Sequence, residues 1–131
     1  MIELEWIGTP MSVCRVVDFS GVDRDGEYVF TARTRDEHSL VCPTQRVPDG
    51  AEKREDGWRM FRVCGVLEFS LVGILAGISG VLAQAQISLF VLSTYDTDYV
   101  LVREEYCEHA EKALAQAGYC WKMNRDNAKG K

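Results

Sequence analysis

The spacing of apolar residues changes repeatedly along the second half of the chain. Residues 59–66 are typical of a strand. Apolar residues then recur at helical spacing, at Leu71, Ile74, Leu75, Ile78, Val81 and Leu82. Residues 87–94 are rich in β-branched and aromatic side chains, which favours a strand. The polar turn at residues 95–97 and the strand-like residues 98–102 predict that this strand returns as a hairpin.

Helix-capping signals predict where the helices begin and end. Ser70 is a suitable N-cap for the first helix, and Phe69 and Ile74 would form a hydrophobic staple around it. A second helix is predicted over residues 104–117, with Gly118 at its C′ position. Its buried stripe would contain Tyr106, Cys107, Ala110, Ala113, Leu114 and Ala117. A last strand over residues 119–123 completes a β-α-β-β-α-β order, the ferredoxin-like α+β arrangement.

The chain contains an internal repeat. Residues 13–20 (VCRVVDFS) match residues 63–70 (VCGVLEFS), which is an offset of 50. Residues 30–36 (FTARTRD) match residues 90–96 (FVLSTYD) at an offset of 60. The growth of the offset by ten residues predicts that the first copy has lost most of its first helix. Strands are expected there over residues 12–19, 28–34 and 39–42.

The repeat predicts two tandem modules. Residues 1–57 would form a degenerate N-terminal module with a shortened first helix, and residues 58–123 a complete C-terminal module. The sequences Pro48-Asp49-Gly50 and Lys53-Arg54-Glu55-Asp56 would mark the junction between them. Residues 124–131 are expected to form a polar tail.

Several of these segments resemble a known family. FSLVGIL (residues 69–75) followed by STYDTDY (93–99), together with SLVCP (39–43) and RVP (46–48), is similar to the small ACT-domain proteins of the CASTOR type. The resemblance implies two ACT-like modules side by side, with a free amino acid bound at a module interface. It also implies regulation instead of catalysis. The ligand would meet residues 68–73 and 87–96, and any regulated partner is expected to be another chain.

The candidate ligand-binding residues are Glu68, Phe69, Ser70, Leu71, Val72, Gly73, Ile87, Thr94, Asp96 and Asp98. A helix N-terminus offers unpaired backbone N–H groups to the carboxylate of an amino acid. Gly73, expected at the third position of the helix, would leave that turn open. Glu68, Asp96 and Asp98 are the nearest candidates to accept from the ammonium group.

Composition excludes several other classes of function. The net charge of −5 and the absence of a basic run argue against nucleic-acid binding. Residues 69–95 carry no charge and are long enough to span a bilayer, but Gln84 and Gln86 interrupt them and neither flank carries a basic cluster, so no membrane segment is expected. The five cysteines include no CxxC pair, which favours reduced thiols in the cytoplasm and argues against a metal site or another cofactor.

Three functions remain open from the sequence. The leading hypothesis is an amino-acid sensor, homodimeric, that changes its affinity for a protein partner when it binds its ligand. The alternative is a dimerising scaffold on ACT-like modules that binds no ligand. A small hydrolase or isomerase comes third, because His38 and His109 belong to no recognisable catalytic motif, and an enzyme is not expected.

Overall fold

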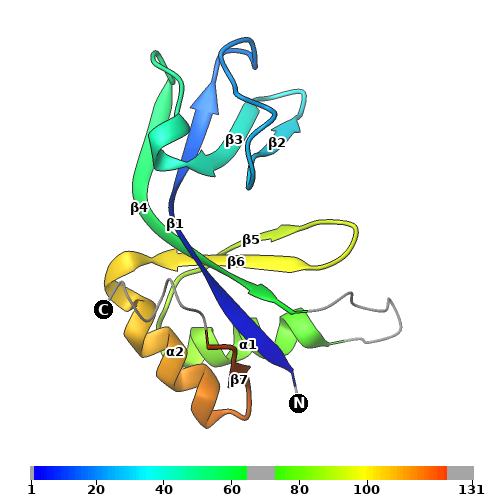
Figure 1. Cartoon of the computed structure of the whole chain (residues 1–131), viewed down its shortest axis with the longest axis vertical. Coiled ribbons are helices and arrows are strands. Elements are labelled where there is room, and N and C mark those ends of the chain that lie inside the picture. Colours follow the sequence, from blue (N-terminus) through cyan, green and yellow to red (C-terminus); the bar gives the residue numbers. More distant parts are fainter. Residues whose placement is uncertain (1, 65–72, 124–131) are drawn as a thin grey trace. The chain divides into compact units, whose positions relative to one another are not determined.

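The computed structural model of the chain describes residues 2–64 and 73–123. Two compact units form: unit 1 consists of Met1–Gly8 and Arg59–Lys131, and unit 2 of Thr9–Trp58. The elements in Figure 1 are the strands β1 (Glu3–Val16), β2 (Phe30–Arg33), β3 (His38–Pro43), β4 (Lys53–Val63), β5 (Phe90–Ser93), β6 (Asp98–Arg103) and β7 (Cys120–Trp121), the α-helices α1 (Ile74–Gln84) and α2 (Cys107–Gln116), and the 3₁₀ turns η1 (Thr44–Arg46) and η2 (Glu104–Tyr106).

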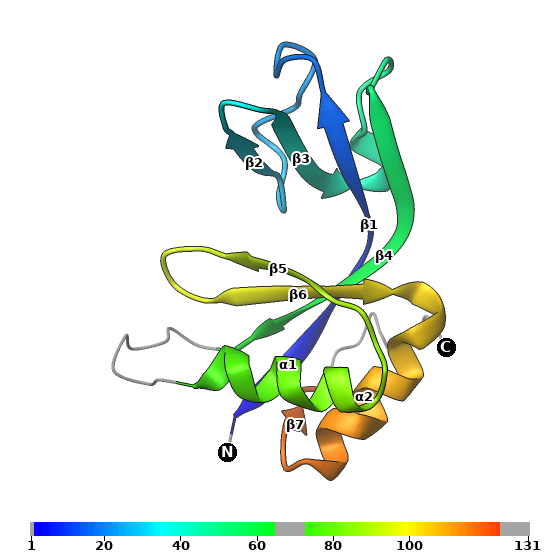
Figure 2. The ribbon, with the colours of Figure 1, turned by 180° about the vertical axis from the view of Figure 1, so that it is seen from behind.

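Unit 1 is an α+β unit with both α-helices packed on one face of its sheet, as Figure 2 shows. The strand order in this unit is β7-β1-β4-β6-β5. β5 and β6 form an antiparallel hairpin from the pair Phe90 and Leu101 to the pair Ser93 and Asp98. The short β7 lies parallel to the start of β1, where Leu4 is paired with Trp121.

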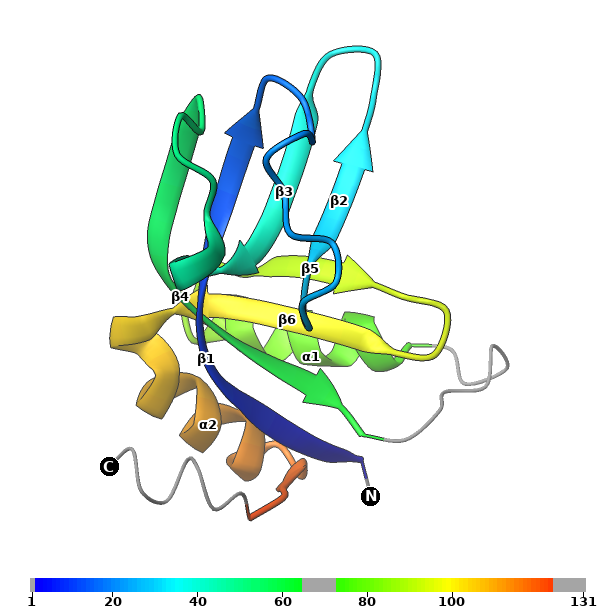
Figure 3. The same cartoon turned by 45° about the horizontal axis from the view of Figure 1, so that its top comes forward.

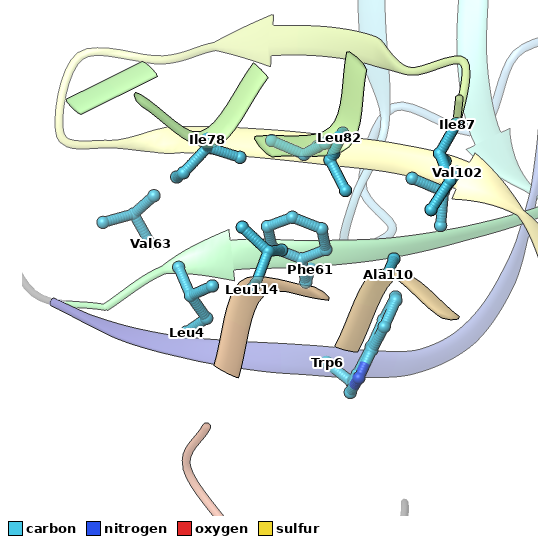
Figure 4. Packing of buried hydrophobic residues seen from close by; sticks show 11 residues of the cluster. Leu4, Trp6, Phe61, Val63, Ile78, Leu82, Ile87, Val102, Ala110 and Leu114 are labelled. Atoms are coloured by element: carbon cyan, nitrogen blue, oxygen red, sulfur yellow. The ribbon is translucent and has the colours of Figure 1, made fainter. Parts of the chain in front are cut away.

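The core of unit 1 lies between this sheet and its helices (Figure 4). Alternate strand residues point into it, as expected for a sheet with one covered face. The helices contribute residues four positions apart, which lie on one helix face. The buried residues are Leu4, Trp6, Phe61, Val63, Ile78, Leu82, Ile87, Val100, Val102, Ala110 and Leu114.

Aromatic side chains join α2 to the sheet of unit 1. The rings of Trp6 and Trp121 are stacked with centroids 5.1 Å apart, and Phe61 meets both rings edge-on. Both indoles also donate to Glu111, Trp6 Nε1 to its carboxylate at 2.7 Å and Trp121 Nε1 to its backbone oxygen at 3.0 Å. The polar end of each tryptophan is therefore satisfied where its ring is buried.

Unit 2 contains the second half of β1 and the first half of β4, with strand order β2-β3-β1-β4 (Figure 3). Its core residues Cys14, Val16, Leu40 and Cys42 are covered by partly buried side chains from two connections. Phe19, Val22 and Val29 come from residues 17–29, and Val47 and Ala51 from residues 47–52. These connections stand where unit 1 has its helices.

Residues 9–58 contain no α-helix, so the predicted degeneracy of the first copy goes further than one shortened helix. Residues 17–29 replace the longer connection 64–89 that holds α1. η1 corresponds to η2, but no helix follows η1. Val47 is extended, with ψ 126°, because it precedes Pro48, which disfavours helical conformation at that position.

The repeat is visible in the hairpins of the two units. β2 pairs with β3 from Phe30 and Val41 to Arg33 and His38, and each of these pairs recurs in β5 and β6 exactly 60 residues later. The sequence match at an offset of 50 does not correspond to the structure. Cys14 is a core residue of unit 2, whereas Cys64 lies outside the core cluster of unit 1.

Two ion pairs show which residues of β1 and β4 correspond to one another in the two units. Arg15 pairs with Glu52 in unit 2, and Arg62 pairs with Glu5 in unit 1. Arg62 comes 47 residues after Arg15, and Glu5 comes 47 residues before Glu52. Side chains alternate between the two faces of a strand. An offset of 47 therefore aligns the core residues of one unit with the core residues of the other, whereas an offset of 50 does not. The buried Val16 then corresponds to the buried Val63.

β1 and β4 are antiparallel, and each strand is shared between the two units. The first half of β1 belongs to unit 1, and the first half of β4 belongs to unit 2. Cys64 N donates to Glu3 O at 2.9 Å, and Glu52 N donates to Arg15 O at 2.8 Å. The structure therefore differs from the predicted boundary between residues 57 and 58. Residues 3–8 belong to unit 1, so residues 58–123 do not form a complete module by themselves.

Other predicted boundaries also shift. The junction predicted at Lys53-Arg54-Glu55-Asp56 is the start of β4, and the last strand is limited to Cys120–Trp121. α1 begins at Ile74 with Gly73 as its N-cap, so Gly73 is not at the third helical position. Ser70 and Phe69, predicted as N-cap and staple, lie outside the described residues, as does the predicted tail 124–131. Gly118 has the positive φ of 104° expected after α2.

The two corresponding ion pairs differ in burial. The side chains of Arg62 and Glu5 are 31% and 14% exposed, against 47% and 50% for Arg15 and Glu52. We expect Glu5→Gln to lower the free energy of unfolding by about 1–3 kcal/mol and Glu52→Gln by less than about 1 kcal/mol, because solvent weakens the exposed pair. Urea unfolding of both variants measures the difference, and equal losses would contradict this ranking.

Two glycines of α1 give a second matched comparison. A methyl group at Gly80 would meet nothing within 4 Å, so Gly80→Ala should stabilise the chain by about 0.5–1 kcal/mol through helix propensity. At Gly77 it would lie 2.7 Å from Tyr119 Oη, so Gly77→Ala should destabilise. In a Tyr119→Phe background Gly77→Ala should regain stability. Thermal unfolding of the four variants tests this, and a Gly77→Ala gain equal to that of Gly80→Ala would refute the contact.

Candidate functional site

The turn of the β5–β6 hairpin, the end of β4 and the start of α1 lie at the same end of unit 1, as Figures 1 and 3 show. A buried hydrogen bond joins two of these elements. Thr97 is 6% exposed, and its Oγ1 donates to the backbone oxygen of Val63 at 2.7 Å. The hairpin is therefore held against the strand that leads toward α1.

Hydrogen bonds within the turn fix its polar side chains. Thr94 N donates to Thr97 O at 2.8 Å, and Thr94 Oγ1 donates to the same oxygen at 3.1 Å. Ser93 Oγ donates to Asp98 Oδ1 at 2.6 Å, which sets the orientation of that carboxylate. Asp96 is exposed at the tip of the turn. The turn thus presents two carboxylates.

The first turn of α1 carries backbone N–H groups that have no partner within the helix. Gly73 is the exposed N-cap, with φ 84°, and its carbonyl accepts from Gly77 N at 2.8 Å. None of the described side chains caps this end, and the first turn contains no acidic residue. Such an end favours a negatively charged group, because the helix dipole adds partial positive charge.

The structure brings together four of the predicted ligand-binding residues and separates one. Gly73, Thr94, Asp96 and Asp98 lie at the end of unit 1 just described. Ile87 lies at the far end of α1, where its N–H donates to Leu82 O, and its side chain is 3% exposed within the core. The other five, Glu68, Phe69, Ser70, Leu71 and Val72, lie outside the described residues.

Thr97 has a positioning role that sequence reasoning missed. In the sequence it is one of three polar turn residues, and only its place directly before β6 distinguishes it. Its hydroxyl makes the bond to Val63 described above. No local signal marks this role, because the carbonyl that accepts the bond belongs to β4, 34 residues away in the sequence.

Cys14, Cys42 and Cys107 are buried or half-buried thiols with poor nucleophilicity, whereas Cys120 is exposed. Burial raises the pKa of Cys42 and of Cys107 to about 11, and burial also raises the pKa of Cys14. At neutral pH these thiols are protonated, and the thiolate is the reactive form. Among the described residues, no group of three or more His, Cys, Asp and Glu side chains could hold a metal ion.

No helix within residues 2–64 and 73–123 is long and apolar enough to cross a membrane. α1, the most apolar helix, spans Ile74–Gln84 and packs through Ile78 and Leu82 onto the sheet of unit 1. α1 contains no charged residue, because one face packs on the sheet and most of its exposed residues are small.

Comparison with known proteins identifies the family. Residues 53–116, which contain β4, α1, the β5–β6 hairpin and α2, match the model of the ACT domain. The chain is similar to protein Atu0741 from Agrobacterium tumefaciens, with 30% identity over 95% of this chain and 94% of that one, and a TM-score of 0.84. The chain belongs to the ACT-domain family, and the resemblance to its small members of the CASTOR type is confirmed.

More distant structures share the fold. A protein of unknown function from Vibrio cholerae, described as a possible transport protein, is 20% identical over 88% of both chains, with a TM-score of 0.65. The regulatory subunit of aspartate kinase from Thermus thermophilus is 12% identical over 88% of this chain and 96% of that one, with a TM-score of 0.64. None of the curated proteins compared with the chain matches it. ACT domains are in general regulatory modules that bind amino acids.

The Thr97 bond predicts a local stability effect. Thr97→Val keeps the shape of the side chain but leaves the Val63 carbonyl without this donor in a buried position. We expect a loss of about 1–3 kcal/mol in the free energy of unfolding. Thr31→Val, on the exposed strand β2, serves as the control and should change stability by less than about 0.5 kcal/mol. Chemical denaturation compares them, and similar small effects would contradict the role of Thr97.

Proposed function

We propose that the chain is a regulatory module that binds a free amino acid at the end of unit 1 formed by the hairpin turn and the start of α1. The observation that carries the proposal is the ACT-domain match, because residues 53–116 include every described element of this end. The exposed N-cap of α1 and the two turn carboxylates add the chemistry that such a ligand requires.

The two charged groups of an amino acid fit these two features. Its carboxylate accepts from the backbone N–H groups that open α1, and its ammonium donates to Asp96 and Asp98. Each charge-assisted hydrogen bond contributes about 1.5–3 kcal/mol, so two or three of them supply roughly micromolar affinity. The predicted residues 68–72 would complete the site on the side that leads into the helix.

Tandem ACT-like modules and self-association belong to the same proposal. The identical hairpin registers in the two units support a duplicated ACT-like origin. β2 and β5 end the order of the described strands, and a homodimer would cover such edges. We expect the module to act in the cytoplasm. Ligand binding would change the module's affinity for a partner chain only if the ligand bound two states of the module unequally.

The proposal is tested by thermal unfolding of the chain with each standard amino acid. A ligand at a hundred times its dissociation constant adds about 2.7 kcal/mol, which raises the midpoint by roughly 8–15 °C. Asp96→Asn should weaken binding about tenfold or more through loss of a charge-assisted bond. Asp36→Asn is the matched control, since Asp36 is the corresponding exposed residue of the β2–β3 turn, and it should leave the affinity unchanged.

Two results would count against the proposal. If no amino acid shifts the midpoint, a dimerising scaffold that binds no ligand becomes the better account. If an amino acid binds but Asp96→Asn and Asp36→Asn behave alike, the ligand sits elsewhere in the chain.

A further inference from the structure

Because the two hairpins correspond, the position in unit 2 that is equivalent to the candidate site of unit 1 can be identified. Thr34 N donates to Glu37 O at 2.9 Å, as Thr94 N does to Thr97 O at 2.8 Å. The hydroxyl of Thr34 also accepts from Glu37 N at 3.1 Å, and that of Thr94 accepts from Thr97 N at 3.4 Å. The β2–β3 turn of unit 2 is therefore the counterpart of the turn that carries Asp96 and Asp98.

That counterpart lacks the helix start that unit 1 has. Residues 9–58 contain no α-helix, so unit 2 has no helix N-terminus beside its turn. The connection that replaces the helix bonds to itself instead. Asp18 Oδ1 accepts from Ser20 N at 3.0 Å and from Ser20 Oγ at 2.6 Å. A carboxylate of the chain itself therefore already occupies a backbone N–H and a hydroxyl of this connection.

The acceptor side is also different. The position of Asp98 is taken in unit 2 by His38, because Ser93 pairs with Asp98 where Arg33 pairs with His38. Phe19 lies against His38 with ring centroids 5.1 Å apart and planes at 69°. The Arg24 guanidinium lies 5.5 Å from the Phe19 ring centroid. A ligand ammonium would meet an imidazole shielded by an aromatic ring and a nearby cation, where unit 1 offers a carboxylate.

The connection is held in this closed arrangement by further contacts. Arg46, from η1, forms an ion pair with Asp23. Gly26 lies so close to Arg46 that an added methyl group would be 2.6 Å from its Nη1. Phe19 and Val22 pack on the core of unit 2. Opening this position would therefore break packing and an ion pair.

From these contacts we infer that unit 2 is closed to free amino acids at the position corresponding to the candidate site, and that ligand recognition falls to unit 1 alone. Asp18 and Phe19 fill that position from within the chain. The assignment of recognition to unit 1 rests on the proposed function, whereas the closure of unit 2 does not. A chain with two ACT-like halves would then bind one ligand.

Residue-resolved NMR of the full chain tests this inference. Backbone amide shifts are recorded while each standard amino acid is titrated to millimolar concentration. The expected result is movement of Gly73 and residues 93–98 with one chemical class, no movement of residues 18–20 and 34–38, and one ligand per chain. Saturable shifts at residues 18–20 or 34–38, or two ligands per chain, would overturn the inference.

Two reciprocal variants sharpen the test. Asp98→His should weaken binding about tenfold or more, because it replaces the acceptor with the residue found in unit 2. His38→Asp should not create a second site, since the helix start remains absent, and a second site in this variant would also overturn the inference. If no amino acid moves any amide of either unit, unit 2 is closed as inferred and the proposed function fails.

Discussion

The antiparallel pairing of β1 with β4 is the interaction on which the rest of the structure depends. The start of β1 bonds to the end of β4, and the end of β1 bonds to the start of β4. Residues 3–8 thereby become an inner strand of unit 1, and the first half of β4 joins the sheet of unit 2. Leu4 and Trp6 supply part of the core against which both helices pack. Without this exchange, each unit would lose a strand together with the apolar side chains on its covered face.

The two units show two ways of covering one face of similar hairpins. In unit 1 the cover is helical, and four side chains at a spacing of four residues, Ile78, Leu82, Ala110 and Leu114, reach the core. In unit 2 short connections place Phe19, Val22, Val29, Val47 and Ala51 over a smaller core. A short connection can satisfy hydrophobic burial, but it does not provide a helix start with its unpaired N–H groups. Unit 2 therefore keeps a sheet like that of unit 1 but has no helix N-terminus.

Much of unit 1 could be predicted because its patterns are local. The hairpin at Phe90–Ser93 and Asp98–Arg103, the helix after Glu104 and the C′ glycine at Gly118 follow from periodicity and turn chemistry. The role of residues 3–8 could not be predicted, because the identity of a strand's neighbour is a long-range property. The sequence match at an offset of 50 aligned Cys14, a core residue of unit 2, with Cys64, which lies outside the core cluster of unit 1. Identity over a short segment carries no information on which side of a sheet a residue faces. The sequence predicted correctly that Asp96 and Asp98 lie at the hairpin turn. The buried bond of Thr97 could not be predicted, because it depends on β4.

The position of residues 3–8 also has a consequence for synthesis. The ribosome makes this strand before either of its neighbours in unit 1, which lie at residues 59–63 and 120–121. The apolar residues Leu4, Trp6 and Ile7 therefore lack a partner strand until β4 has emerged, and the other edge of their strand stays open until β7 has emerged. Contacts of such high sequence separation form slowly, and exposed strand edges are prone to aggregation meanwhile.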